Sequence, residues 1–239
     1  MPRLAYLRLA GEWVMTDIAV VNGAAGALGR AVVRALVARG DHVVAVTRDG
    51  RPGDLGTDGV RVEAADLTAP DQVEALWGRL DESDDRPRWV VNAAGGYRPG
   101  SVAETEPDGY RFVHDLNLAT AWWSCRAAAT RLPAGGGIVN VASRSALVGG
   151  AGSAAYTVAK AGVVRLTTVL AAELAGRGVR VNAVLPSVMD TAANRDTMSR
   201  EAMRTAVPTD DVAAVVSFLC SDAARAVTGA AIPTYGTTS

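Results

Sequence analysis

Short runs of β-branched residues alternate with helix-forming segments along most of this chain of 239 residues. The predicted strands are Ile18–Val21, His42–Thr47, Val60–Glu63, Trp89–Asn92, Gly137–Val141 and Val179–Leu185. The predicted helices are Ala27–Arg39, Pro70–Leu80, Pro107–Arg131, Ala155–Ala175 and Thr209–Ser221. Apolar strands that alternate with helices favour a parallel sheet covered on both faces. With right-handed crossovers, this order predicts a single-domain α/β fold with a doubly wound, Rossmann-type parallel sheet.

The length of the chain suits one large α/β domain and is short for two. We expect residues 15–239 to form this domain. Residues 186–208 are polar and weakly periodic, and we interpret them as a mobile lid over the substrate. Residues 1–14 lack the long apolar core of a secretory signal, so they are interpreted as an N-terminal extension, or Met15 is the biological start.

Composition argues against several functions. The net charge is −1, and acids and arginines are interspersed, so neither nucleic acid nor a membrane surface is an expected partner. No apolar run reaches transmembrane length. Cys125 and Cys220 lie in apolar, helix-like stretches, which favours buried free thiols in a reducing compartment such as the cytoplasm. His42 and His114 have no neighbours at ligand spacing, so no metal site is predicted.

A glycine-rich turn follows the first strand. Gly23, Gly26 and Gly29 form a G-x-x-G-x-x-G pattern that runs directly into a helix. Glycines at this place let the backbone approach a pyrophosphate, and the helix N-terminus supplies N–H groups. Any tight strand-to-helix turn needs glycine, but the position after the first strand of an α/β chain favours dinucleotide binding.

The second strand ends in Thr47-Arg48. An acid at this place would bond a ribose hydroxyl and repel a 2′-phosphate, whereas a hydroxyl and a guanidinium suit a phosphate. The pair therefore predicts that NADP(H) is preferred over NAD(H). Asp49 follows directly and weakens this prediction, and a solvated surface arginine is the alternative.

Other polar or small residues follow later strands. Asp66-Leu67 comes after the third strand, Asn92-Ala93-Ala94-Gly95 after the fourth, and Ser143 after the fifth. A carboxylate at Asp66 could accept from an adenine amino group, and small residues permit close approach of a cofactor. Ligands bind beyond the carboxyl ends of strands in open α/β sheets, so we expect these residues to share one site.

Lys160 is the one lysine among 24 basic residues, and it lies four positions after Tyr156. Residues with this spacing share a helix face. A nearby ammonium lowers the pKa of a tyrosine from about 10, which makes the phenol a usable acid and base near neutral pH. All other basic side chains counted here are arginines, so the presence of a lysine at position 160 indicates that this position needs a compact ammonium. A surface lysine beside a helix-start tyrosine is the alternative.

Taken together, these motifs resemble the short-chain dehydrogenase/reductase family, in its short single-domain branch, from about Asp17 onward. The matching segments are Asn22–Gly29, Asp66–Thr68, Asn92–Gly95, Asn117, Ser143, Tyr156-x-x-x-Lys160, Asn182–Pro186, and Ser221-Asp222 with Thr228-Gly229. The chain departs from the family pattern at three positions. Asn22 replaces the usual threonine, Ala27 replaces a glycine, and Ser187 replaces the glycine after Pro186.

The resemblance implies an NADP(H)-dependent oxidoreductase that interconverts a carbonyl and an alcohol, similar to carbonyl and 3-oxoacyl reductases. It implies a catalytic tetrad of Asn117, Ser143, Tyr156 and Lys160. In this tetrad, Tyr156 would exchange a proton with the substrate oxygen, and Ser143 would position that oxygen. Lys160 would hold the nicotinamide ribose, and Asn117 would hold a water that links Lys160 to solvent. The implied cofactor contacts are Gly23, Ala25, Ala27, Leu28, Gly29, Arg48, Asp66, Leu67, Asn92, Ala93, Gly95, Tyr156, Lys160, Pro186, Val188 and Thr191. A homodimer or homotetramer is also implied.

Two other functions stay open at this stage. One is an NAD(P)-binding sensor without turnover, and the other is a lyase or epimerase that uses bound NAD(P). The substrate is not identified by the sequence. Arg98 and Arg144 could hold an acidic substrate group, but pairing with local acids is the favoured interpretation.

Overall fold

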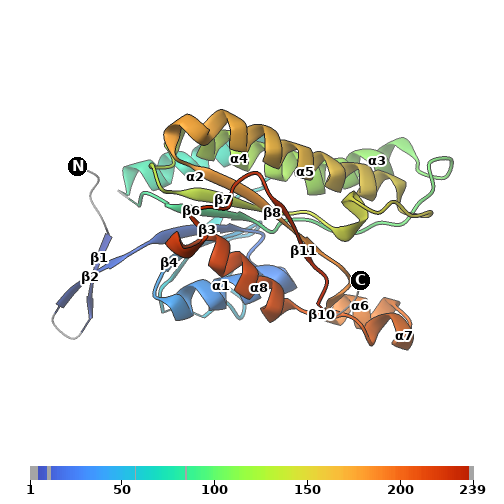
Figure 1. The fold of residues 1–239 in the computed structure, drawn as a ribbon, viewed down its shortest axis with the longest axis horizontal. Coiled ribbons are helices and arrows are strands. Elements are labelled where there is room, and N and C mark those ends of the chain that lie inside the picture. The colour runs from blue at the N-terminus through green and yellow to red at the C-terminus, as the bar shows by residue number, and fades with distance from the viewer. Residues whose placement is uncertain (1–4, 10–11, 57, 84, 237–239) are drawn as a thin grey trace.

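The centre of the fold is a seven-stranded parallel sheet with the spatial order β11-β8-β7-β6-β3-β4-β5 (Figure 1). The structure is a computed structural model that describes residues 5–9, 12–56, 58–83 and 85–236. The strands are β3 (Ile18–Asn22), β4 (His42–Thr47), β5 (Val60–Ala64), β6 (Trp89–Asn92), β7 (Gly137–Val141), β8 (Arg180–Pro186) and β11 (Ala231–Thr234). The order reverses between β3 and β6, which confirms the predicted doubly wound fold.

Helices cover both faces of this sheet (Figure 1). On one face, α1 (Ala27–Arg39) and α8 (Thr209–Leu219) pack against the strands. On the other, α2 (Pro70–Glu82), α4 (Thr120–Arg131) and α5 (Ala154–Leu174) bury a second core. Cys125 and Cys220 are buried free thiols, as predicted, and burial raises the pKa of both to about 12.

The helix predicted over Pro107–Arg131 is interrupted by one wider turn. The chain forms α3 (Pro107–His114), a π-helical turn at Asp115–Ala119, and then α4 without leaving the helical path. Turns of this type are rare in proteins and are frequent at functional sites. The turn contains Asn117, whose side chain is directed to the loop after β6.

Three asparagines form an in-register ladder across the middle of the sheet. Asn22 pairs with Asn92 across β3 and β6, and Asn92 pairs with Asn140 across β6 and β7. The Nδ2 of Asn22 donates to Oδ1 of Asn92 at 2.8 Å, and the Nδ2 of Asn92 donates to Oδ1 of Asn140 at 2.8 Å. Asn140 then donates to Thr167 of α5 at 2.9 Å, and Asn22 donates to Ser124 of α4 at 2.7 Å. The ladder therefore ties three strands to two helices through buried polar groups.

Several elements were not predicted from the sequence. The edge strand β11 is one, although it contains Pro233. The segment 186–208 holds more structure than its weak periodicity predicted. It contains two short helices, α6 (Ala192–Thr197) and α7 (Arg200–Met203), and the parallel pair β9 (Met189–Asp190) and β10 (Val207–Pro208).

The predicted N-terminal extension, residues 1–14, lies partly outside the described residues. Within it, β1 (Ala5–Leu9) pairs in antiparallel fashion with β2 (Glu12–Thr16). The pair forms a two-stranded sheet of its own, and β2 crosses the predicted boundary after residue 14. In the part of the chain that the structure describes, no helix has the length and apolarity needed to cross a membrane.

Candidate active site

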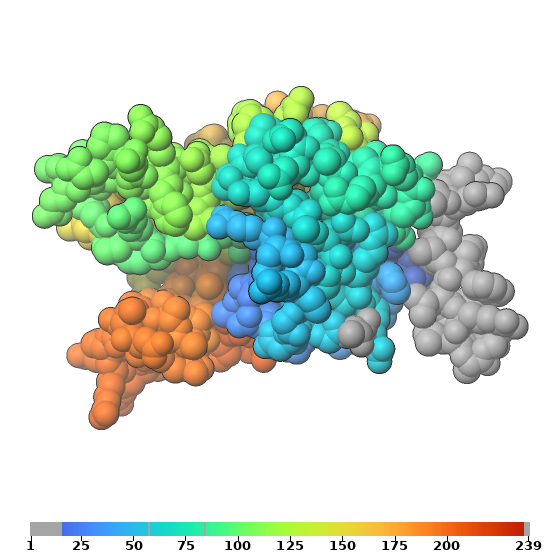
Figure 2. Space-filling view, turned by 180° about the vertical axis from the view of Figure 1, so that it is seen from behind, coloured from blue at the N-terminus to red at the C-terminus, as the bar shows by residue number. Residues whose placement is uncertain are grey.

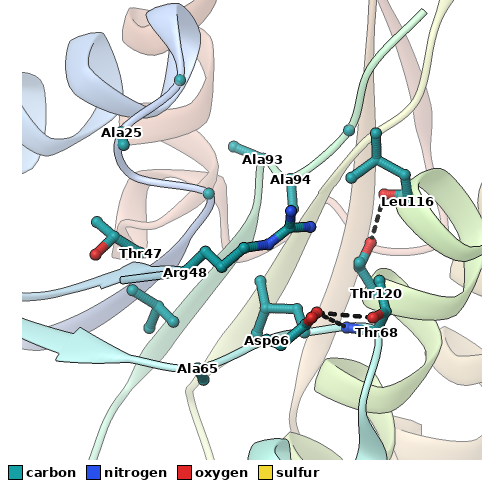
Figure 3. A pocket seen from close by; sticks show the side chains of 15 residues that line it. Ala25, Thr47, Arg48, Ala65, Asp66, Thr68, Ala93, Ala94, Leu116 and Thr120 are labelled. Atoms are coloured by element: carbon teal, nitrogen blue, oxygen red, sulfur yellow. Dashed lines mark hydrogen bonds between the residues drawn. The ribbon is translucent and has the colours of Figure 1, made fainter. Parts of the chain in front are cut away.

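A cavity of about 210 Å³ lies at the carboxyl ends of β3, β4, β5 and β6, where the strand order reverses (Figure 3). Seven of the predicted cofactor residues line it. They are Gly23, Ala25, Arg48, Asp66, Leu67, Ala93 and Gly95. Thr68, which the sequence analysis named only within the matching segment Asp66–Thr68, also lines the cavity, and the sequence reasoning missed Leu116 and Thr120, which complete one wall. The switch point of an open α/β sheet is the place where such folds bind ligands.

The turn after β3 fits closely against the turn after β6. Gly23 has a φ of +78°, and a Cβ added there would lie 2.6 Å from both Cα and N of Ala94. A Cβ added at Gly29 would overlap the carbonyl oxygen of Gly23. Glycine is therefore required at both positions, and the bare backbone of this turn faces the cavity as a pyrophosphate cradle requires. Leu28 and Gly29 are buried, and with Ala27 they lie in the first turn of α1 and do not line the cavity.

The end of β4 carries two donors without a hydrogen-bond partner among the described residues. Thr47 is only 4% exposed, yet its Oγ1 has no hydrogen-bond partner among the described residues. Arg48 is exposed and makes no ion pair or hydrogen bond within that part of the chain. Asp49 pairs with Arg51 instead, at 3.6 Å. Figure 3 shows Arg48 reaching across the cavity from β4 toward Ala94.

Asp66 provides the acidic side of the same cavity. Its Oδ1 accepts hydrogen bonds from Oγ1 of Thr68 at 2.7 Å and from the Thr68 backbone N–H at 3.0 Å. These two bonds, with a smaller contribution from the charge of Arg48, lower the pKa of Asp66. The carboxylate is therefore ionised at neutral pH and is held in place as an acceptor.

Lys160 is buried next to Tyr156 at the start of α5. It is 4% exposed, and its Nζ donates to the carbonyl oxygen of Val141 at 2.8 Å. Burial lowers the pKa of Lys160 from 10.5 to about 8. Its Nζ lies 5.9 Å from the centroid of the Tyr156 ring, which confirms that the two side chains share a helix face.

The pKa of Tyr156 is raised, which corrects the predicted direction. Burial is the main cause, because it disfavours the charged phenolate. The hydroxyl of Ser143 lowers the pKa, and Tyr97, whose ring meets that of Tyr156 edge-on at 5.2 Å, raises it. The prediction was wrong because it counted the charge of Lys160 and neglected the shared burial of both groups.

Ser143 and Asn117 complete the predicted tetrad from two other elements. Ser143 follows β7, and its Oγ accepts hydrogen bonds from the backbone N–H and the hydroxyl of Ser145. Asn117 is 1% exposed and clamps Gly96, since its Oδ1 accepts from Gly96 N at 3.2 Å and its Nδ2 donates to Gly96 O at 2.9 Å. The amide of Asn117 is thus engaged by backbone groups and positions the loop after β6.

Gly95 joins the tetrad to the cavity. A Cβ added to Gly95 would lie 2.8 Å from Oδ1 of Asn117 and 3.2 Å from Nζ of Lys160. Gly95 also lines the cavity. The predicted nucleotide site and the predicted catalytic group are therefore two parts of one continuous site.

Other predicted contacts lie away from the cavity. The amide of Asn92 is committed to the buried asparagine ladder. Pro186, Val188 and Thr191 stand at the base of the 186–208 segment, where Thr191 caps α6 by accepting from Asn194 N at 3.2 Å. Figure 2 shows this segment, in orange, as a lobe that faces the green segment following β6 across a hollow.

Arg98 and Arg144 do not pair with local acids, so the favoured interpretation was wrong. Within the described ranges, neither guanidinium forms an ion pair. Arg98 lies 6.0 Å from the ring centroid of Phe112, and Arg144 lies 5.2 Å from that of Tyr235.

Comparisons with known proteins place the chain in a family. The family model described as Enoyl-(Acyl carrier protein) reductase matches residues 23–236. The chain is 35% identical over 238 residues to D-threitol dehydrogenase of Mycolicibacterium smegmatis, covering 89% of each protein. It is 36% identical to L-rhamnose 1-dehydrogenase (NAD(P)(+)) of Azotobacter vinelandii, covering 89% of this chain and 93% of that one. A crystal structure from Burkholderia xenovorans, described as a putative short-chain dehydrogenase/reductase, has a TM-score of 0.86 at 30% identity and covers 92% of this chain and 95% of its own.

A doubly wound sheet with a cavity at its switch point is the architecture of dinucleotide-binding enzymes. The comparisons narrow this class, and the chain belongs to the short-chain dehydrogenase/reductase family. It is an oxidoreductase of alcohol and carbonyl groups, in a family that depends on NAD or NADP.

Proposed function

We propose that the protein uses NADP(H) in preference to NAD(H) to interconvert a small carbonyl compound and its alcohol, with Tyr156 as the general acid and base. One observation carries this proposal. Gly95 lies on the nucleotide cavity and also against Asn117 and Lys160, so that a cofactor bound in the cavity would meet the tetrad.

The nicotinamide cofactor supplies or accepts the hydride. Tyr156 holds its proton at neutral pH, because burial raises its pKa, and this proton is available to the oxygen of a carbonyl substrate. Ser143 lies beside the phenol, and its hydroxyl can donate to the same oxygen and orient it. General acid catalysis of this kind accelerates a reaction by about 10²–10⁴-fold.

Lys160 serves as the proton source behind Tyr156. One of its three N–H groups is donated to Val141, which leaves two for the hydroxyls of a bound ribose. With a pKa of about 8, the ammonium is charged at pH 7 and yet releases a proton more readily than an exposed lysine. Asn117 acts as a positioning residue, since its amide fixes the loop that carries Gly95 and Gly96.

The preference for NADP(H) rests on the end of β4. Arg48 forms no ion pair within the described ranges, although its charge acts on the carboxylate of Asp66 in the same cavity, and the buried hydroxyl of Thr47 has no hydrogen-bond partner there. A 2′-phosphate would give the exposed guanidinium of Arg48 a counter-charge and match its donors, whereas a bare ribose hydroxyl would not.

Steady-state kinetics with NADPH and NADH test the cofactor preference. A hydrogen bond to a charged group is worth about 1.5–3 kcal/mol, so Arg48→Asp should lower kcat/KM for NADPH by roughly 10–100-fold. The same change should leave NADH turnover nearly unaltered. Arg51→Asp is the matched control, because Arg51 is exposed and paired with Asp49 nearby. Equal wild-type affinities for the two cofactors would contradict the role given to Arg48.

The chemistry is tested with a panel of ketones and aldehydes, by following NADPH absorbance. Tyr156→Phe should lower turnover by roughly 10²–10⁴-fold and keep most of the cofactor affinity, because the adenine and phosphate contacts lie elsewhere in the cavity. Oxidised cofactor should be released in proportion to the alcohol formed. Turnover without net cofactor oxidation would indicate a lyase or epimerase, and NADPH binding without any turnover would indicate a sensor.

We also propose a homo-oligomer, formed through the surface of α4. Trp122 is 50% exposed, and it lines a second, apolar cavity of about 290 Å³ together with Leu118 and Trp123. A monomer leaves such a patch in water, whereas an interface covers it.

The two buried free thiols support a cytoplasmic location. The lobe formed by residues 186–208 supports the proposal that this segment is a lid on the substrate side of a domain spanning residues 15–239.

A further inference from the structure

Many guanidinium groups in the described part of the chain pair with acids. Arg61 pairs with Glu63 at 2.7 Å, Arg131 with Glu74 at 3.0 Å, and Arg88 with Asp17 at 2.9 Å. Others donate to backbone carbonyls, as Arg180 does to Leu219 O at 2.8 Å. Arg144 departs from this pattern. It is partly buried beside the reacting serine, and within the described residues it has neither an acid nor a hydrogen-bond acceptor.

The contact of Arg144 with Tyr235 fixes where its charge lies. Arg144 follows the end of β7, Tyr235 follows β11, and β8 runs between these strands. β7 and β8 pair as far as Val141 and Val184, and β8 and β11 pair as far as Pro186 and Thr234. Arg144 lies in the short 3-10 turn after β7, Ser187 directly after β8 and Tyr235 directly after β11, so all three follow carboxyl ends of neighbouring strands. With its carbon Cζ 5.2 Å from the Tyr235 ring centroid, the guanidinium extends over the carboxyl end of β8.

A second unused donor lies directly after β8. The Oγ of Ser187 is buried and has no hydrogen-bond partner among the described residues. Asp190 is the acid nearest to Ser187 along the chain. It forms an ion pair with Arg195 at 2.6 Å and none with Arg144.

The tyrosine contact holds the guanidinium without neutralising it. A cation–π contact attracts the guanidinium but supplies no negative charge, and a buried donor without an acceptor is destabilising. A carboxylate satisfies both needs, because its two oxygens match the guanidinium fork and accept from a hydroxyl as well. Neutral polyols offer no counter-charge to this arrangement.

We propose that the physiological substrate is an oxo acid or hydroxy acid, whose carboxylate binds Arg144 and Ser187 while its reacting oxygen lies between Ser143 and Tyr156. This inference rests on the proposed function of the tetrad. Neighbouring strands are about 4.8 Å apart, so the carboxylate lies roughly one strand spacing from the reacting carbon. Short acids with about two to five bonds between the two groups fit this span.

Equilibrium binding tests the carboxylate site independently of catalysis. Calorimetry in the presence of NADP⁺ compares 4-oxopentanoate and 5-oxohexanoate with their methyl esters. The wild-type protein should bind at least one acid more than about 10-fold tighter than its ester. Arg144→Gln should remove this difference, Arg144→Lys should keep part of it, and Ser187→Ala should reduce it. Arg225→Gln is the matched control, because Arg225 is exposed, has no ion pair in the described ranges, and follows Asp222, far from the carboxyl ends of the strands.

Tyr156→Phe separates this inference from the function on which it depends. Loss of turnover with the preference for the acid intact supports both. If the wild-type protein reduces neutral ketones, yet binds acid and ester equally or binds neither acid, the carboxylate site is refuted and the proposed function stands. Preference for the acid that survives in Arg144→Gln also overturns the inference.

Discussion

Replacing Gly23 with alanine should destabilise the protein in two separable ways. The backbone at Gly23 has a φ of +78°, where a residue with a Cβ costs about 1–2 kcal/mol. The added Cβ would also lie 2.6 Å from Cα and N of Ala94, which are backbone atoms that cannot rotate away. Overpacking of this kind costs about 1–3 kcal/mol. We therefore expect a total loss of about 3 kcal/mol.

Gly56→Ala provides the matched control. Gly56 has a φ of +79°, and a Cβ added there would have no atom of the described residues within 4 Å beyond its own chain neighbours. This variant carries the conformational cost alone, about 1 kcal/mol. The difference between the two variants isolates the close approach of the turns after β3 and β6.

Thermal unfolding by calorimetry measures this difference. In a domain of this size, about 1 kcal/mol shifts Tm by roughly 2–4 °C, so we expect a fall of roughly 6–12 °C for Gly23→Ala and roughly 2–4 °C for Gly56→Ala. The affinity for NADPH should fall in the first variant only, because Gly23 lines the cavity. Equal losses of Tm in Gly23→Ala and Gly56→Ala would mean that the Ala93–Ala94 backbone moves to accommodate the new Cβ. The close packing described for the site would then be refuted.

Three further predictions concern the tetrad and the surface. Lys160→Arg should lose turnover about as severely as Tyr156→Phe, roughly 10²–10⁴-fold, because the larger guanidinium stays protonated; near-normal kcat would show that only charge matters. Burial lowers the pKa of Lys160 from 10.5 to about 8, so the unfolded chain binds the extra proton between about pH 8 and 10.5. The stability of wild type relative to Lys160→Met should therefore rise with pH over that window, and a flat difference in denaturant titrations would contradict the burial. Light scattering should find a dimer or tetramer whose mass falls in Trp122→Glu, and a monomeric wild type at micromolar concentration would rule the oligomer out.

Periodicity was sufficient to predict the central elements, because each is long enough to show its pattern. The bounds of α1 and β4 agree with the prediction at both ends. β11 escaped prediction because it has four residues, one of them Pro233, which an edge strand tolerates. The short helices α6 and α7 gave only local signals, the caps at Thr191 and Ser199.

The location of the candidate site was predictable for residues whose place along the chain decides where they lie in the fold. Gly23, Arg48 and Asp66 follow strand ends, and all carboxyl ends of a parallel sheet meet at one edge. Asn92 was assigned to the cofactor for the same reason, but its side chain turns into the core, where two other asparagines complete its hydrogen bonds. The pKa of Tyr156 was misjudged because the degree of burial depends on Tyr97 and on packing that the sequence does not display.

The asparagine ladder has a consequence for how the sheet assembles. Its members are 70 and 48 positions apart, so β3, β6 and β7 must find their alignment through distant, slowly formed contacts. A slip by one residue would turn the amides out of contact and leave several buried polar groups unpaired, at about 1–3 kcal/mol each. The ladder therefore discriminates against misaligned sheets during folding. Gly23 follows Asn22 directly, and Ser143 lies shortly after Asn140. A chain whose strands pair in the register of the ladder therefore also places its glycine-rich turn and Ser143 correctly relative to each other.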